Sequence, residues 1–458
     1  MNTRRPGDQP ADPVGSDKLR TTSAAVRSRQ DTRLDPYVGH YAERTQQMSA
    51  SAVRALFAVA NRPEVVSLAG GMPNLADLPL ENLAGTVGRL VAEQGQRAMQ
   101  YGAGQGELML REQICEVMAV EQISAHPDDV LVSVGSQQGL ALITQIFCDP
   151  GDVVLCEAPS YVGALGVFRT YQAQVVHVAM DEHGLDPVAL REAIATGRAS
   201  GQRIKFLYTI PNFHNPAGIS QPVERRREIL EICSAAGILV VEDNPYGLLG
   251  FDTDPTPAIR SLDAEGVVYL GSFSKTFAPG FRIGWVLAPH AIKEKLVLAQ
   301  ESATLCPPIF SQYTVSAYLR DYDWRGQIKQ FNTLYRDRRD AMLAGLEANM
   351  PAGTTWTRPG GGFFVWLTIP PQLDAEAMLP RAVSARVAYV PGNAFYADGL
   401  GSRHMRLSFC LPPPEDIVEG TRRLGDVMKN ELSINEVFAN PDRPSELRGF
   451  EGPLPNQR

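Results

Sequence analysis

The sequence lacks several features that would place it in a familiar functional class. No apolar run approaches the roughly 18–20 residues that a membrane-spanning helix needs. The six cysteines form no CxxC pair and the seven histidines form no HExxH motif, so neither a disulfide framework nor a metal site is indicated. Basic residues are not in excess, because the formal net charge is −8. We therefore expect no nucleic-acid or membrane partner, and the scattered cysteines suit a reducing cytoplasm.

The two ends of the chain differ from its middle. Residues 1–40 contain arginine, acids and proline but no apolar core, and residues 436–458 are rich in proline and charge. This composition predicts a disordered N-terminal extension and a flexible tail, not a signal or transit peptide. Between them we expect an N-terminal arm with a capping helix and part of a small domain at 41–90, a large domain at 91–315, and the rest of the small domain at 316–435.

Short apolar runs alternate with longer amphipathic stretches from about residue 130, which is typical of α/β layering. The runs are apolar throughout, as in a parallel sheet that is covered on both faces. Ligands bind such sheets beyond the carboxyl ends of the strands, so polar residues at those ends are candidates for a site. The expected strands are 130–133, 152–156, 175–178, 204–208, 238–241 and 267–270.

Polar residues of five different kinds follow the ends of these strands. In chain order they are Asn215, Asp243, Tyr246, Lys275 and Arg282. Together they are the groups that a site needs to hold a phosphorylated pyridine aldehyde as a Schiff base. Lys275 would form that link and then act as general base, while Asp243 would keep the pyridine nitrogen protonated. A single loop lysine is usually an ordinary surface residue, but this context predicts a pyridoxal-phosphate (PLP) site.

The remaining groups would hold the ring and the phosphate. Asn215 and Tyr246 would donate hydrogen bonds to the phenolate oxygen, and Arg282 would make a forked contact with the phosphate. A helix that begins directly after Gly135 would offer its N–H groups and its dipole to the same phosphate. Taken singly, these residues could also be turns, helix caps or core aromatics. The further candidates for cofactor contacts are Ser136, Gln137, Gln138, Tyr161, Ser272 and Ser274.

On these motifs the chain resembles the class I/II aminotransferases of PLP fold type I, over about residues 45 to 430. The spacing is specific: 28 positions separate Asn215 from Asp243, 32 separate Asp243 from Lys275, and 7 separate Lys275 from Arg282. The resemblance implies an α/β fold, with a three-layer large domain around a mainly parallel sheet and a smaller α+β domain. It also implies a homodimer with active sites at the interface.

The resemblance assigns roles to further residues. Arg406 would grip the substrate α-carboxylate, and Asn215 would also contact the substrate. Gly71 would lie close over the substrate, and Tyr101 would reach the cofactor phosphate of the partner subunit. The chain is most similar to the branch that contains 2-aminoadipate and kynurenine aminotransferases. In bacterial 2-aminoadipate enzymes of this type, an arginine matching Arg54 contacts the acidic side chain. A solvated helix arginine fits Arg54 equally well.

The predicted function is transamination by ping-pong chemistry between an L-amino acid and a 2-oxo acid. Glutamate and 2-oxoglutarate would be one pair, and the other amino acid would be 2-aminoadipate-like, aromatic or branched-chain. A serine acyl-enzyme is a weak alternative, because the SxxK pattern ending at Lys275 has no SDN or KTG motif beside it. A transcription regulator would need a winged helix-turn-helix of roughly 70 residues, longer than the stretch before the capping helix. A lyase, racemase or oxidative PLP enzyme stays open, because the same first carbanion serves them all.

Overall fold

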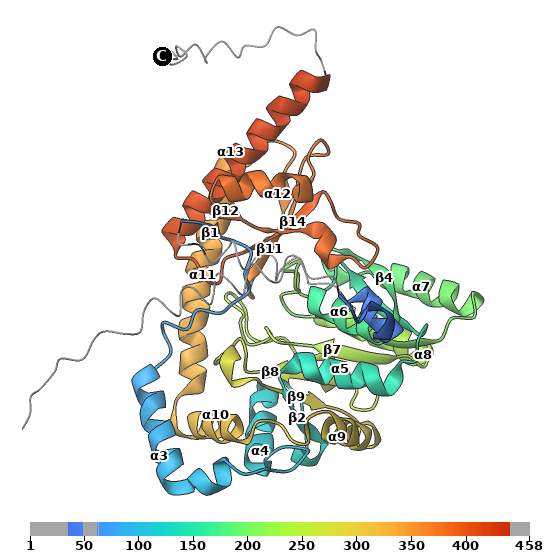
Figure 1. Ribbon diagram of the computed structural model, residues 1–458, viewed down its shortest axis with the longest axis vertical. Coiled ribbons are helices and arrows are strands. Elements are labelled where there is room, and N and C mark those ends of the chain that lie inside the picture. Colours follow the sequence, from blue (N-terminus) through green and yellow to red (C-terminus); the bar gives the residue numbers. More distant parts are fainter. Residues whose placement is uncertain (1–34, 49–61, 63, 440–458) are drawn as a thin grey trace, which may run out of the picture. The chain divides into compact units, whose positions relative to one another are not determined.

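The computed structural model describes residues 35–48, 62 and 64–439 (Figure 1). The chain divides into two compact units, 1–47 and 48–458. The described part of the first unit contains two short 3₁₀ helices, η1 (Val38–His40) and η2 (Glu43–Gln47). Most of the expected N-terminal extension and C-terminal tail, together with the expected capping helix that carries Arg54, lie outside the described residues. The expected domain limits stay a prediction.

An eight-stranded sheet forms the centre of the second unit, in the order β2-β9-β8-β7-β6-β3-β4-β5. Neighbouring strands from β8 through to β4 run parallel, whereas β9 is antiparallel to both its neighbours and β5 is antiparallel to β4. Every strand expected from an apolar run is present. The strands are β2 (Val130–Val134), β3 (Val153–Ala158), β4 (Gln174–Asp181), β5 (Gly184–Leu185), β6 (Ile204–Thr209), β7 (Leu239–Asp243), β8 (Val267–Ser272) and β9 (Ile283–Leu287).

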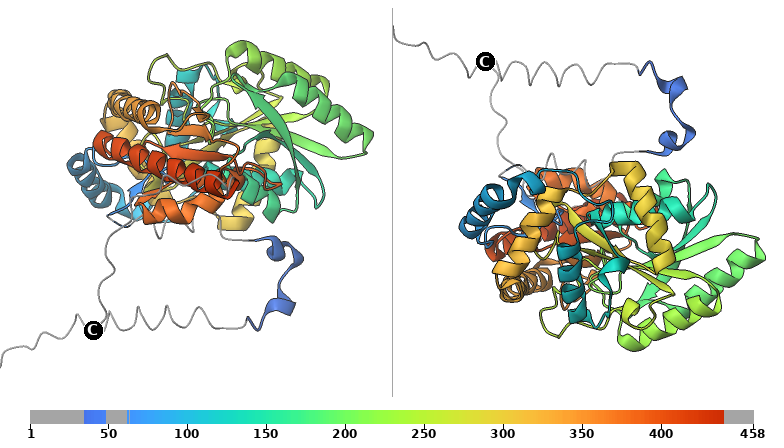
Figure 2. Two further views of the ribbon diagram at one scale, coloured as in Figure 1. Left: turned by 90° about the horizontal axis from the view of Figure 1, so that it is seen from above. Right: turned by 90° about the horizontal axis from the view of Figure 1, so that it is seen from below.

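Helices cover both faces of this sheet, which confirms the three-layer expectation. Along β3, Val154 and Cys156 belong to one core cluster, while Val153 and Leu155 belong to another on the opposite face. Figure 2 shows α7 and α8 on one side of the sheet and α5 and α6 on the other. Burial on both faces explains why the strands are apolar throughout. The covering helices are α5 (Ser136–Phe147), α6 (Val162–Thr170), α7 (Pro187–Ala199), α8 (Val223–Ala235) and α9 (His290–Thr304).

A second sheet, in the order β10-β11-β14-β13, is antiparallel and lies in the C-terminal part of the chain. The long helices α11 and α13 pack along each other beside it (Figure 1). This arrangement is the expected α+β domain. Its elements are β1 (Val66–Ser67), α11 (Trp324–Asn349), β10 (Thr355–Trp356), β11 (Phe364–Thr368), α12 (Ala375–Ser384), β12 (Val387–Ala388), β13 (Val390–Pro391), η7 (Gly392–Phe395), β14 (His404–Ser408) and α13 (Pro414–Ala439).

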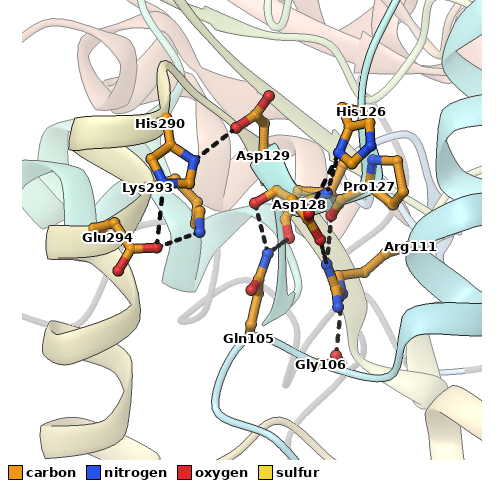
Figure 3. Close-up of polar contacts among 11 residues, drawn as sticks. Gln105, Gly106, Arg111, His126, Pro127, Asp128, Asp129, His290, Lys293 and Glu294 are labelled. Atoms are coloured by element: carbon orange, nitrogen blue, oxygen red, sulfur yellow. Dashed lines mark hydrogen bonds and ion pairs between the residues drawn. The ribbon is translucent and has the colours of Figure 1, made fainter.

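A polar cluster fixes the loop between the helices α3 and α4 against the start of β2 (Figure 3). Gln105 Nε2 donates a hydrogen bond to the Asp128 carbonyl at 2.8 Å. The buried Arg111 side chain donates to the carbonyls of Gly106 and Pro127. Both side chains bond to the backbone, so they fix the path of the loop. The remaining elements are α3 (Leu80–Ala98), α4 (Leu108–Met118), η3 (Ala119–Glu121), η4 (Pro127–Asp129), η5 (Ile259–Ser261), η6 (Pro279–Phe281) and α10 (Ile309–Asp321).

Among the described helices, none is both long enough and apolar enough to cross a membrane.

The packing of α13 against α11 predicts a large stability effect. Leu424 on α13 is fully buried in the core that also contains Met342 and Leu346 of α11. Leu424→Ala should lower the free energy of unfolding by about 2–5 kcal/mol, because it removes buried apolar contacts and leaves a cavity. Denaturant unfolding followed by circular dichroism measures the change. The half-exposed Val418, on the same helix, is the control, and Val418→Ala should change little. Equal effects of the two variants would contradict this account of the packing.

Candidate active site

A cavity of about 410 Å³ opens beyond the carboxyl ends of β6, β7 and β8. Twelve of the residues expected from the sequence line it, and they come from segments spread over more than 300 positions. Arg54 lies outside the described residues, and neither Tyr101 nor Gln138 lines the cavity. The expected residues that do line it are Gly71, Ser136, Gln137, Tyr161, Asn215, Asp243, Tyr246, Ser272, Ser274, Lys275, Arg282 and Arg406.

Lys275 lies in the loop after β8, and its amine is buried in this cavity. Nζ donates a hydrogen bond to the Gly71 carbonyl at 2.8 Å. Burial lowers the pKa of Lys275 to about 8, and the positive charges of Arg406 and Arg282 act in the same direction. A lysine with this pKa is partly neutral near physiological pH, so it can act both as a nucleophile and as a base.

Asp243 ends β7, and its two carboxylate oxygens have different surroundings. Oδ2 accepts a hydrogen bond from the Tyr208 hydroxyl at 2.7 Å. Oδ1 is buried and has no hydrogen-bond partner among the described residues. Burial raises the pKa of Asp243 to about 6, and the hydrogen bond from Tyr208 opposes that rise. An orphaned carboxylate oxygen in a cavity wall suits a cationic N–H donor such as a protonated ring nitrogen, so Asp243 fits PLP.

The opposite end of the cavity suits a phosphate. Arg282 Nη1 lies 3.4 Å from Ser274 Oγ, and the Ser272 hydroxyl donates to the same oxygen at 2.9 Å. The helix α5 begins at Ser136, directly after Gly135 with φ of 74°. A Cβ atom at Gly135 would come within 2.3 Å of Arg282 Nη2, so only glycine lets the guanidinium lie across the helix start. A guanidinium, two hydroxyls and a helix N-terminus therefore converge where an anion would bind.

Arg406 enters the cavity from β14 of the other sheet. Its Nη1 donates to Asn215 Oδ1 at 2.9 Å and its Nη2 donates to the Ala69 carbonyl at 2.8 Å. Nε is buried and has no hydrogen-bond partner among the described residues. Burial lowers the pKa of Arg406 to about 10, which leaves the guanidinium charged at neutral pH. Because Asn215 uses its oxygen for Arg406, its Nδ2 remains available as a donor.

A buried polar network lies behind the cavity and centres on Glu157 of β3. The Glu157 carboxylate accepts hydrogen bonds from the Ile210 amide at 2.9 Å and from Gln221 Nε2 at 2.8 Å. His214 Nε2 lies 3.1 Å from the same carboxylate, and His214 Nδ1 accepts from the Ala217 amide. The Nε2 edge of the imidazole therefore faces Glu157. This network ties the end of β3 to the loop that carries the cavity asparagine.

Sequence reasoning missed several of these residues. Glu157 carries a detectable signal, because it is the one charged group in an otherwise apolar strand. Tyr208 carries a weaker signal, because its strand also contains a lysine and a threonine. Phe364 carries no such signal in the sequence. Its ring lies 4.1 Å from the Arg406 guanidinium, and a Cβ atom at Gly71 would come within 2.8 Å of it. Gly71 therefore leaves room for Phe364, which is a contact between distant parts of the chain.

Two residues that were expected to contact the cofactor do not line the cavity. Gln138 Oε1 accepts a hydrogen bond from the Val134 amide at 2.6 Å, which holds the side chain on the backbone before α5. Tyr101 is 77% exposed and does not line the cavity of its own chain. The described residues contain no group of three or more His, Cys, Asp or Glu side chains that could hold a metal ion.

Comparison with known proteins gives one consistent family. A family model described as aminotransferase class I and II matches residues 63–424. The chain is 40% identical to aromatic-amino-acid aminotransferase 1 of Thermococcus litoralis, over 86% of this chain and 95% of that protein. It is 37% identical to 2-aminoadipate transaminase of Thermus thermophilus, over 85% of this chain and 96% of that protein.

Solved structures agree with the sequence relatives. The kynurenine aminotransferase of Pyrococcus horikoshii, solved with PMP, superposes with a TM-score of 0.84 at 37% identity, over 88% of this chain and 100% of that one. The α-aminoadipate aminotransferase LysN of Thermus thermophilus, complexed with N-(5'-phosphopyridoxyl)-L-leucine, gives 0.81 at 35% identity, over 88% of this chain and 100% of that one. With these matches along most of its length, the chain belongs to the class I and II aminotransferases, the PLP-dependent transaminases of fold type I.

Proposed function

We propose that this transaminase works by ping-pong exchange, with glutamate and 2-oxoglutarate as one substrate pair. The second amino acid would be aromatic, branched-chain or 2-aminoadipate-like. The observation that carries the proposal is one cavity that contains a lysine of lowered pKa, an orphaned carboxylate oxygen and a buried arginine. Amino acids and 2-oxo acids are the substrates of the family.

We assign the cofactor contacts as follows. Bound PLP supplies an electron sink for the charge that forms when an amino acid loses its Cα proton. Asp243 Oδ1 would accept the N–H of the ring, and Asn215 Nδ2 and the Tyr246 hydroxyl would donate to its phenolate oxygen. Tyr161 would pack on the ring face. The phosphate contacts would come from Ser136, Gln137, Ser272, Ser274 and Arg282, all of which line one cavity.

On the substrate side, Arg406 would hold the α-carboxylate and Lys275 would take the Cα proton on Nζ. The side chain of the substrate would lie against apolar residues that line the same cavity, including Met72, Val162 and Phe364. These surfaces favour aromatic and branched-chain substrates through apolar burial. The cations that line the described cavity are Lys275, Arg282 and Arg406, and each has another role in this proposal. An acidic substrate side chain would therefore need Arg54 as its partner.

We also propose a homodimer in which Tyr101 reaches the cofactor of the partner subunit. Tyr101 is 77% exposed, yet its loop is anchored through Gln105 and Arg111 (Figure 3). The flanking Met99 and Leu108 are exposed as well. An exposed apolar surface on a fixed loop suits a protein interface. The six cysteines are unpaired, which supports a cytoplasmic location.

An amino-donor screen tests the function directly. With 2-oxoglutarate as acceptor, L-phenylalanine, L-leucine or L-2-aminoadipate should yield glutamate in a coupled assay. Lys275→Ala should lower this rate by about 10³-fold or more, because it removes the group that transfers the proton. The exposed Lys295 is the control, and Lys295→Ala should keep full activity. Consumption of the donor without glutamate formation would instead favour a lyase, racemase or oxidative enzyme.

The lowered pKa of Lys275 predicts how cofactor uptake depends on pH. Only the neutral amine attacks an aldehyde, and with a pKa of about 8 its neutral fraction rises through that pH. An ordinary lysine, with a pKa near 10.4, would become neutral only at much higher pH. The apoenzyme should therefore take up PLP covalently at a rate that rises with pH through about 8 and then levels off. Borohydride trapping at timed intervals measures this rate, and a continued rise up to about pH 10 would contradict the assignment.

The Glu157 network predicts a positioning effect. Glu157→Gln removes a charged acceptor from a buried network, which costs roughly 1–3 kcal/mol. The dissociation constant of PLP and the KM of the donor should both rise about tenfold or more, because the loop that carries Asn215 loses its support. The surface residue Glu228, which pairs with Arg191, is the control, and Glu228→Gln should change neither constant. Unchanged constants in Glu157→Gln would remove the network from the site.

A further inference from the structure

A second cavity, of about 420 Å³, lies between the first half of α11 and the segment that follows Tyr246. It shares no lining residue with the active-site cavity. Part of its wall is apolar, formed by Leu248, Phe251, Trp324 and Ile328. Its volume is close to that of the cavity that would hold cofactor and substrate, so there is room for a small organic molecule.

Charged side chains of both signs line this second cavity, and Asp254, Arg325 and Lys329 among them are exposed to solvent. Arg325 and Lys329 form no ion pair with any described residue, and the Arg325 guanidinium lies 4.3 Å from the Trp324 ring centroid. Asp254 lines the same cavity and likewise has no ion-pair partner in the described part of the chain. The third lining cation, Arg336, is already close to a carboxylate, at 3.5 Å from Asp252.

A buried acceptor adds to this pattern. Asn332 lines the cavity, and its Nδ2 donates to the Leu248 carbonyl at 3.2 Å. Its Oδ1 is buried and accepts no hydrogen bond from the described residues. A buried acceptor without a donor normally has a water or a ligand as its partner.

These groups would suit a ligand that carries one positive charge, one negative charge and an apolar side chain. Arg325 and Lys329 suit a carboxylate, while Asp254 and Asn332 Oδ1 suit an ammonium group. The apolar wall suits an aromatic or large aliphatic side chain. We propose that this cavity is a second binding site, separate from the active site, for an α-amino acid with an apolar side chain. A simple anion would supply no hydrogen-bond donor for the Asp254 carboxylate or for Asn332 Oδ1.

The backbone that forms part of this cavity's wall is hydrogen-bonded to a second segment, and both segments also reach the active-site cavity. Leu249 accepts a hydrogen bond from the Gly362 amide at 3.0 Å, and the Phe251 amide donates to the Gly360 carbonyl at 2.8 Å. The first segment begins at Tyr246 and the second leads to Phe364, both of which line the active-site cavity. An amino acid bound against Leu248 and Phe251 therefore contacts backbone that is shared with the active site.

Equilibrium dialysis of the holoenzyme with α-methyl-L-phenylalanine tests the proposal. This probe is a zwitterion with an aromatic side chain, and it has no Cα proton, so it cannot be turned over. The wild-type enzyme should bind more than one molecule per chain. In Arg325→Ala/Lys329→Ala the second site should weaken at least about tenfold, because two charge-assisted contacts are lost. The exposed Lys295 and Lys429 give the matched control, and Lys295→Ala/Lys429→Ala should keep full occupancy.

Two further probes test the zwitterion itself. 3-Phenylpropionate lacks the ammonium group and phenethylamine lacks the carboxylate, so each should bind the second site at least about tenfold more weakly. Asp254→Asn should weaken α-methyl-L-phenylalanine without affecting 3-phenylpropionate. Wild-type binding that is unchanged in Arg325→Ala/Lys329→Ala, or equal binding of 3-phenylpropionate at the second site, would each overturn the proposal. Because none of these measurements depends on turnover, their failure is distinct from a failure of the proposed transamination.

Discussion

The active site depends on ionisable groups that the fold buries in one cavity without fully pairing them. Asp243 has a carboxylate oxygen without a donor, and Arg406 has a buried Nε without an acceptor among the described residues. Burying such groups costs free energy unless a partner supplies the missing hydrogen bonds. The surrounding sheet holds them in place, so a bound cofactor and substrate, rather than the protein, would complete the network. This is how a site comes to bind charged ligands strongly and in one orientation.

Two sheets contribute to that cavity, and neither is sufficient alone. The large sheet delivers Asp243 and Lys275 at the carboxyl ends of adjacent parallel strands. The smaller antiparallel sheet delivers Arg406, which bonds to Asn215 of the large sheet's loops and to the carbonyl of Ala69. Arg406 is therefore held by both parts of the second unit.

The end of β7 and the segment that follows it contribute residues to both cavities. Asp243 and Tyr246 line the active-site cavity, whereas Leu248 and Phe251 line the second cavity. The backbone between them is bonded to the turn that precedes Phe364. A short stretch of hydrogen-bonded backbone thus separates the two cavities.

The strands of the large sheet and the polar residues at their ends could be predicted from the sequence alone. Burial on both faces produces apolar runs that are visible locally, and the spacing of Asn215, Asp243, Lys275 and Arg282 is fixed along the chain. The other features of the site depend on contacts between distant parts of the chain. The contact between Arg406 and Asn215 joins residues 191 positions apart, and it exists only because the two sheets pack together. The same holds for Phe364 over Gly71 and for the second cavity, since no local pattern records which distant surfaces will meet.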